Sequence, residues 1–123
     1  MQIAFFEVNG KEREFFERKL GKHVLHFHEN PLEERDIKNL MNVEVLVTFI
    51  YSHLTRELLQ NLPCLKLIVT RSTGYDHIDM LYCNQAGIKV CNVPKYGGTS
   101  VAEHTFALIL SLLRHIPRAV QNT

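Results

Sequence analysis

The sequence predicts an α/β fold built on a parallel, five-stranded sheet. Short apolar runs rich in β-branched residues alternate along the chain with longer amphipathic stretches. Glycine or proline residues mark several of the boundaries between them. Because strands that alternate with helices pair in parallel through right-handed crossovers, this alternation sets the fold class.

The first predicted elements are a strand, a helix and a second strand. Residues 3–6 form an almost wholly apolar run, which fits a strand covered on both faces. The charged stretch 11–20 places its apolar side chains on one helical face, and Gly21 is suited to end this helix. Residues 23–28 are less apolar, so we expect a second strand near an edge of the sheet.

The middle of the chain predicts two further helices around the most apolar strand. A helix is expected over residues 32–40, and residues 43–50 give the strongest signal of a buried strand. Thr55 is a candidate N-cap for the next helix, which Pro63 ends. The residues that share the apolar face of that helix are Leu58, Leu59 and Leu62.

The fourth and fifth strands are predicted at residues 65–70 and 88–92, with a helix at 76–86 that Gly87 ends. Five strands in this arrangement suit a flavodoxin-like, doubly wound sheet. Ligands of such sheets bind beyond the carboxyl ends of the strands. The loops that follow the strands are therefore the first place to look for a site.

A different section begins after Asn92. Residues 93–99 contain proline and glycine and predict a loop. Ser100, with Glu103 three positions later, predicts a capping box at the start of a long helix that runs to about His115. This helix is apolar on several sides, so we expect other protein to cover it. The alternative that it packs on the small sheet stays open.

The turn after the fourth strand carries the most informative polar residues. Asp76 is a natural N-cap for the next helix, so the backbone N–H groups of Thr73 and Gly74 are expected to point outward at a helix start. Such a turn binds anions, and glycine lets a ligand approach the backbone closely. The carboxylate of a small acid would fit, although an ordinary strand-to-helix turn has the same residue types.

Two parts of the second half carry a family resemblance. Residues 70–79 read TRSTGYDHID, residues 87–97 read GIKVCNVPKYG, and residues 100–105 read SVAEHT. In this order and spacing they resemble the D-isomer-specific 2-hydroxyacid dehydrogenases, most closely the D-lactate dehydrogenase branch. The resemblance implies a split catalytic domain into which an NAD-binding Rossmann domain is inserted.

The resemblance implies roles for five residues. The backbone amides of Thr73 and Gly74 would hold the carboxylate of a small 2-keto or 2-hydroxy acid, with Ser72 beside them. Tyr96 would line the substrate pocket. Val101 would pack near the nicotinamide ring of NAD. No catalytic residue is assigned.

The resemblance also divides the chain. Residues 1–92 would form the first part of the substrate domain, residues 93–99 a hinge loop, and residues 100–123 the first helix of the NAD-binding domain. The glycine-rich cofactor loop of the family, and its catalytic arginine, glutamate and histidine, have no counterpart in the sequence. We therefore expect an incomplete enzyme, which binds NAD poorly and turns nothing over by itself.

Composition and charge disfavour several other classes. With a formal net charge of +1 and mixed acidic and basic residues, no nucleic-acid-binding face is predicted. No apolar run could span a membrane and no signal peptide stands out, so a cytoplasmic protein is expected. Three cysteines at unrelated spacings predict reduced thiols. His26 and His28 share a strand face, but no third ligand accompanies them, and no metal site is assigned.

The sequence does not fit two other protein classes that share this topology. A receiver domain needs an aspartate where residues 48–50 read TFI, and a flavodoxin needs a phosphate loop where residues 9–12 read NGKE. One alternative function remains, a non-enzymatic interaction module or a degenerate paralogue of the family. In either case we expect a homodimer through the helix near Ser100 to His115.

Overall fold

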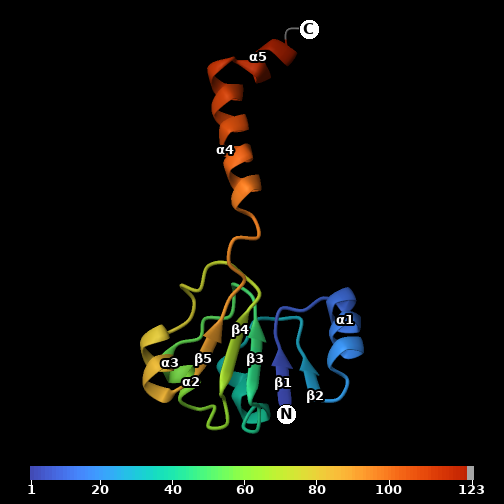
Figure 1. Ribbon diagram of the computed structural model, residues 1–123, viewed down its shortest axis with the longest axis vertical. Coiled ribbons are helices and arrows are strands. Elements are labelled where there is room, and N and C mark those ends of the chain that lie inside the picture. Colours follow the sequence, from blue (N-terminus) through green and yellow to red (C-terminus); the bar gives the residue numbers. More distant parts are fainter. Residues whose placement is uncertain (122–123) are drawn as a thin grey trace.

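The computed structural model describes residues 1–121, and its centre is a sheet of parallel strands (Figure 1). The strand order is β2-β1-β3-β4-β5, and every neighbouring pair is parallel. This confirms the predicted flavodoxin-like, doubly wound sheet with its second strand at an edge. The strands are β1 (Gln2–Phe5), β2 (Val24–Phe27), β3 (Val45–Thr48), β4 (Leu67–Thr70) and β5 (Lys89–Cys91).

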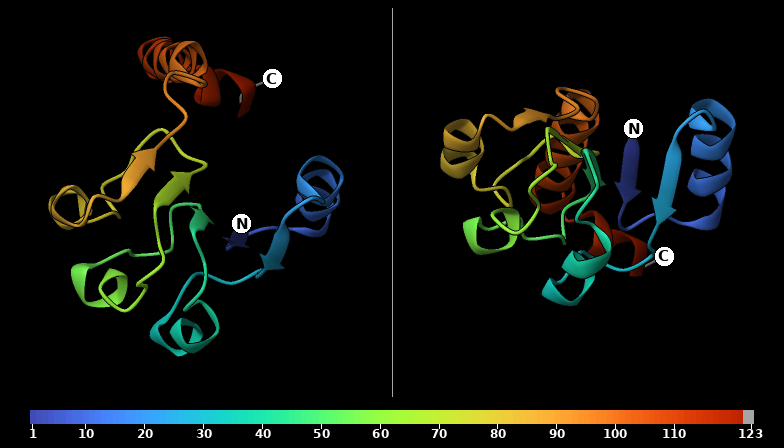
Figure 2. Two further views of the ribbon diagram at one scale, coloured as in Figure 1. Left: turned by 60° about the horizontal axis from the view of Figure 1, so that its bottom comes forward. Right: turned by 90° about the horizontal axis from the view of Figure 1, so that it is seen from below.

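Helices cover both faces of the sheet (Figure 2). The first helix, α1 (Gly10–Leu20), lies on one face. The other face is covered by a 3₁₀ helix, η1 (Glu34–Asn39), and by the α-helices α2 (Arg56–Leu59) and α3 (Met80–Ala86). The last two helices, α4 (Gly98–Leu113) and α5 (Ile116–Gln121), extend away from the sheet (Figure 1).

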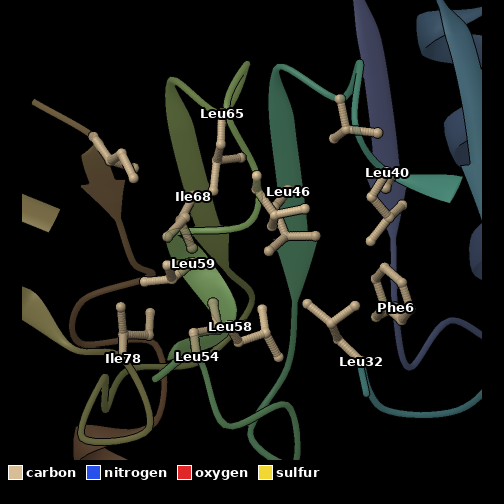
Figure 3. Packing of buried hydrophobic residues seen from close by; sticks show 14 of the residues in the cluster. Phe6, Leu32, Leu40, Leu46, Leu54, Leu58, Leu59, Leu65, Ile68 and Ile78 are labelled. Atoms are coloured by element: carbon tan, nitrogen blue, oxygen red, sulfur yellow. The ribbon is translucent and has the colours of Figure 1, made fainter. Parts of the chain in front are cut away.

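The larger core lies between the sheet and the side with η1, α2 and α3. Leu46 of β3 and Ile68 of β4 are fully buried there, against leucines from the α2 region (Figure 3). Each such side chain stabilises the fold by roughly 1.5–3 kcal/mol. The three leucines predicted on one helical face are all buried, namely Leu58, Leu59 and Leu62. This core fixes the positions of the loops at the carboxyl ends of β3 and β4.

Helix α1 closes the other face over a smaller, aromatic core. The ring of Phe5 lies between those of Phe16 and Phe27, with centroid distances of 4.7 and 4.8 Å. The helix begins at Asn9, whose side chain accepts a hydrogen bond from the backbone N–H of Glu12, while the Glu12 carboxylate accepts from the backbone N–H of Asn9. This reciprocal capping satisfies two backbone donors that a helix start leaves free.

The helix predicted at residues 76–86 is shorter than expected, and its N-cap is Asp79 instead of Asp76. Residues 76 and 77 form a turn, in which the N–H of Ile78 donates to the carbonyl of Tyr75 at 3.1 Å, and Ile78 then pairs with Leu54. The backbone N–H of Leu54 donates to the carbonyl of His77 at 2.8 Å, and Leu54 accepts from Asp79 at 2.9 Å. A contact with a distant part of the chain therefore overrides the local capping signal.

Two other helix predictions need correction. The helix expected over residues 32–40 is the shorter 3₁₀ helix η1. The capping box predicted for Ser100 and Glu103 is absent, since α4 begins at Gly98 after Gly97 and has no side-chain cap. The N-cap is therefore Gly97, three residues before the predicted Ser100.

Helix α4 does not pack on the sheet, so that alternative is wrong for this structure. Most of its large apolar residues are exposed, including Phe106 at 65%, Leu112 at 72% and Leu113 at 69%. After a break at Arg114 and His115 the chain continues as α5, in which Pro117 occupies the first turn, where proline is tolerated. The predicted segment 100–123 ends in residues 122 and 123, which lie outside the described residues.

Candidate functional site

The predicted site residues lie at the carboxyl ends of β4 and β5, where two segments run side by side. One is the loop 71–79, which follows β4 and carries Ser72, Thr73 and Gly74. The other is the segment 92–97, called the connector below, which leads from β5 to α4. The site is thus at the sheet edge where doubly wound folds bind ligands.

Three hydrogen bonds join the loop to the connector. The backbone N–H of Val93 donates to the carbonyl of Ser72 at 3.0 Å. The side-chain amide of Asn92 donates to the carbonyl of Thr73 at 2.7 Å. The hydroxyl of Thr73 donates to the carbonyl of Val93 at 3.0 Å. These bonds hold the carbonyl side of the loop against the connector.

The backbone N–H groups of Thr73 and Gly74 have no acceptor among the described residues. Both residues are exposed, so the donors are open to a solute. They do not lie at a helix start, because α3 begins only at Met80. An anion at this loop would therefore be held by loop amides, without the helix dipole that the sequence suggested.

Ser72 is buried, with 4% of its surface exposed, and its hydroxyl forms hydrogen bonds within the protein. The hydroxyl lies 2.6 Å from that of Thr70 and donates to the carbonyl of Gly74 at 2.6 Å. The second bond joins the two ends of the bend, because the Gly74 carbonyl follows the two free N–H groups in the chain. In this structure the Ser72 side chain supports the loop.

A cavity of about 690 Å³ brings together three of the predicted residues, Thr73, Tyr96 and Val101. Tyr96 and Val101 are 71% and 67% exposed and give it an apolar surface. The remaining residues that line it are Lys95, Gly97, Gly98 and Ser100. Thr73 thus lies beside apolar side chains from the connector and α4. This combination suits a small acid whose remainder is apolar.

Gly74 lines a second cavity, of about 320 Å³, on the other side of the loop. Its remaining lining residues are Ile50, His53, Asp76 and His77. The Nε2 atom of His77 is 3.2 Å from the hydroxyl of Thr70. Burial lowers the pKa of His77 and nearby His53 adds to this, while the carboxylates of Glu7 and Asp76 oppose it. The neutral imidazole is therefore favoured relative to a free histidine.

One hydrogen-bond network near the site was not foreseen from the sequence. The side chain of Arg71 donates to the backbone carbonyls of Phe6 and Glu7, at 3.1 and 2.5 Å, and pairs with the carboxylate of Glu12. The Glu7 carboxylate in turn accepts hydrogen bonds from the loop after β3. Since these partners are 42 or more positions apart, no local spacing could have indicated them.

The described residues contain no cluster of three or more histidine, cysteine or acidic side chains that could hold a metal ion. The three cysteines are free. Among residues 1–121, none of the helices combines the length and the apolar character needed to cross a membrane.

Known sequences resemble this chain over almost its whole length. The family model for the catalytic domain of the D-isomer specific 2-hydroxyacid dehydrogenases matches residues 3–122. A 2-hydroxyacid dehydrogenase homolog from Haemophilus influenzae is 32% identical over 127 residues, covering 100% of this chain and 38% of that protein. A second homolog, from Schizosaccharomyces pombe, is 34% identical and covers 97% of this chain and 37% of its own length.

Solved structures show the same similarity. A D-lactate dehydrogenase from Aquifex aeolicus, complexed with NAD and lactic acid, superposes with a TM-score of 0.86 at 39% identity, covering 98% of this chain and 37% of that one. The D-lactate dehydrogenase of Escherichia coli in its apo form gives 0.72 at 27% identity, covering 100% and 40%. The chain thus spans about two fifths of the length of these relatives.

Proposed function

This chain belongs to the D-isomer-specific 2-hydroxyacid dehydrogenases, and from that premise we propose that it forms the substrate-binding part of an NAD-dependent enzyme. That enzyme interconverts a 2-keto acid and a D-2-hydroxy acid, as the D-lactate dehydrogenases similar to it are named for doing. One observation carries the proposal. The N–H groups of Thr73 and Gly74 have no acceptor among the described residues, and Thr73 lines an apolar cavity.

The carboxylate of the substrate binds to these two amides. A backbone N–H that donates to a carboxylate forms a charge-assisted bond, which is stronger than a bond between neutral groups. The apolar surface of Tyr96 then contacts the rest of a small acid such as pyruvate. Ser72 keeps the bend in shape through its bond to the Gly74 carbonyl. The role of these residues is to orient the carbon that reacts.

The cofactor contact on this chain is Val101. Its exposed side chain lines the same cavity as Thr73, so its apolar surface suits one side of a nicotinamide ring. NAD, when bound, supplies the atom that accepts or donates hydride. The described residues lining the cavity include no histidine, aspartate or glutamate to move the accompanying proton. We propose, as the family resemblance implied, that the 123-residue chain by itself is inactive and binds NAD poorly.

We further propose the division of the chain that the resemblance implied. Residues 1–92 form the substrate domain, residues 93–99 the hinge, and the residues from 100 onward the beginning of the cofactor domain. The separation of α4 from the sheet supports this division (Figure 1). It also supports the second candidate, an interaction or dimerisation module, because a helix with an exposed apolar surface requires a protein cover.

A chimera tests the enzymatic proposal. Residues 1–98 of this chain replace the corresponding residues of the Aquifex aeolicus D-lactate dehydrogenase, whose remaining part supplies α4 and the cofactor site. We expect NADH oxidation that depends on pyruvate or a related 2-keto acid. A folded chimera that binds NADH but reduces no 2-keto acid would contradict the proposal. Binding of NADH to the isolated chain more tightly than about millimolar would contradict the claim of poor cofactor binding.

A further inference from the structure

We propose that Asn92 is a positioning residue for the carboxylate site, a role that rests on the proposed function above. Its side-chain amide lies 2.7 Å from the carbonyl oxygen of Thr73. A carbonyl only accepts hydrogen bonds, so the nitrogen of the amide faces it. Asn92 does not touch the substrate in this scheme. It determines the direction in which the N–H of Gly74 points.

The argument follows from the geometry of the peptide unit. The carbonyl of Thr73 and the N–H of Gly74 belong to one planar peptide, and the described chain contains no cis peptide. In a trans peptide the two groups point in opposite directions. A bond that holds the carbonyl against Asn92 therefore turns the N–H of Gly74 away from the Asn92 side chain.

The preceding peptide is held in the same way. The carbonyl of Ser72 accepts a hydrogen bond from the backbone N–H of Val93 at 3.0 Å. The N–H of Thr73 must then point away from the N–H of Val93. Two successive carbonyls are thus fixed, and the two successive donors point away from the groups that fix them. Pairs of this kind bind an anion better than either donor alone.

The two anchors differ in what secures them. The Ser72 carbonyl is held by a backbone donor, which no side-chain substitution removes. The Thr73 carbonyl is held by the Asn92 side chain. Because the next residue is glycine, which accepts a wide range of φ, this peptide could rotate if the side chain were removed. Rotation would present a carbonyl oxygen to the carboxylate and repel it.

The test is a titration of the 123-residue chain with pyruvate, followed by the amide signals in ¹H–¹⁵N spectra. The unmodified chain should show saturable shifts at Thr73 and Gly74, and acetone, which lacks the carboxylate, should produce none. Asn92→Ala should weaken pyruvate binding about tenfold or more. In this variant the Gly74 amide signal should no longer shift with pyruvate. The Thr73 signal should still shift weakly, because Val93 still binds the carbonyl of the Ser72–Thr73 peptide.

Two further variants keep the result decisive. Asn92→Leu has a similar shape without the donor and should behave as Asn92→Ala does, which covers the case in which one variant fails to fold. The matched control is Asn84→Ala, because Asn84 is exposed on α3 and its side chain makes no hydrogen bond within the described residues. This control should bind pyruvate as the unmodified chain does.

The outcomes separate the two claims. If the unmodified chain binds pyruvate through Thr73 and Gly74, and the folded Asn92 variants bind it equally well, the role of Asn92 is overturned and the carboxylate site stands. If pyruvate shifts neither amide in the unmodified chain, the carboxylate site fails, and the role of Asn92 fails with it. An equal loss at Thr73 and Gly74 in both variants would also contradict selective control of one peptide.

Discussion

The carboxylate of Glu7 accepts a hydrogen bond from the backbone N–H of Ser52 at 3.0 Å, across 45 positions of the sequence. It also accepts from the N–H groups of Phe49 and Tyr51 and from the hydroxyl of Ser52. The same hydroxyl oxygen accepts from the backbone N–H of Leu32 at 3.0 Å. One carboxylate therefore connects the loops that follow β1, β2 and β3.

Glu7→Gln should destabilise the chain by about 1–3 kcal/mol, because an amide nitrogen would face donors that now share a carboxylate. Urea denaturation followed by circular dichroism measures this change. The matched control is Glu14→Gln, since Glu14 is exposed on α1 and no bond of its side chain is seen in the described residues. Equal midpoints for the two variants would show that the Glu7 contacts contribute little.

Gly74→Pro should raise the KM of the chimera for pyruvate about tenfold or more, which corresponds to about 1.4 kcal/mol. Proline removes one of the two N–H donors. Gly74→Ala keeps the donor, and its Cβ would lie 3.6 Å from a carboxylate oxygen of Asp76, an ordinary contact. Steady-state kinetics compares the two. A similar KM for both variants would mean that the N–H of Gly74 does not bind substrate.

Protonation of His77 should destabilise the fold in mild acid. Its pKa is lowered from 6.5, chiefly by burial, so just below pH 6.5 the unfolded chain binds more protons than the folded chain. Stability must then fall as the pH drops through that value toward the lower pKa of the folded state. His77→Gln should reduce this fall, since a glutamine amide can replace Nε2 beside Thr70.

The measurement for His77 is the urea midpoint at about pH 7.5 and about pH 5.5, the range in which histidine titrates. His104→Gln is the matched control, because His104 lies exposed on α4. The prediction fails if both variants lose as much stability between the two pH values as the unmodified chain does.

Self-association of the chain should depend on α4. Phe106, Leu110 and Leu113 are all exposed and lie on one face, since positions four and seven apart are neighbours on a helix. Changing all three to lysine should convert a dimer, measured by size exclusion with light scattering, to a monomer. Leu81→Lys, at a position on α3 that is 76% exposed, should leave the dimer intact. A monomeric unmodified chain would exclude dimerisation through α4.

The alternation of apolar runs with amphipathic stretches was sufficient to predict the sheet. All five strands were located, because strands that are buried on both faces form almost wholly apolar runs. The prediction that Leu58, Leu59 and Leu62 share a buried face was also correct. The roles of the site residues remain predictions that the family resemblance implied. Thr73, Tyr96 and Val101 line one cavity, and Gly74 lines another.

What could not be predicted depends on contacts between distant residues. Asp76 has the composition of an N-cap, yet the pairing of Ile78 with Leu54 moves the helix start to Asp79. The Glu7 contacts are side-chain to backbone bonds, and these follow no periodicity. The free amides were expected at a helix start, whereas they lie in the loop before α3, where Asn92 and Val93 bind the neighbouring carbonyls.

The anchoring of the Thr73 carbonyl on Asn92 has a mechanical consequence. The segment that binds this carbonyl also supports a 16-residue helix, which is about 24 Å long at 1.5 Å per residue. A rotation of only about 10° at the connector would displace the far end of that helix by about 4 Å. A spectroscopic label near Leu113 would thus amplify small rearrangements around a bound acid into a readily measured change of distance.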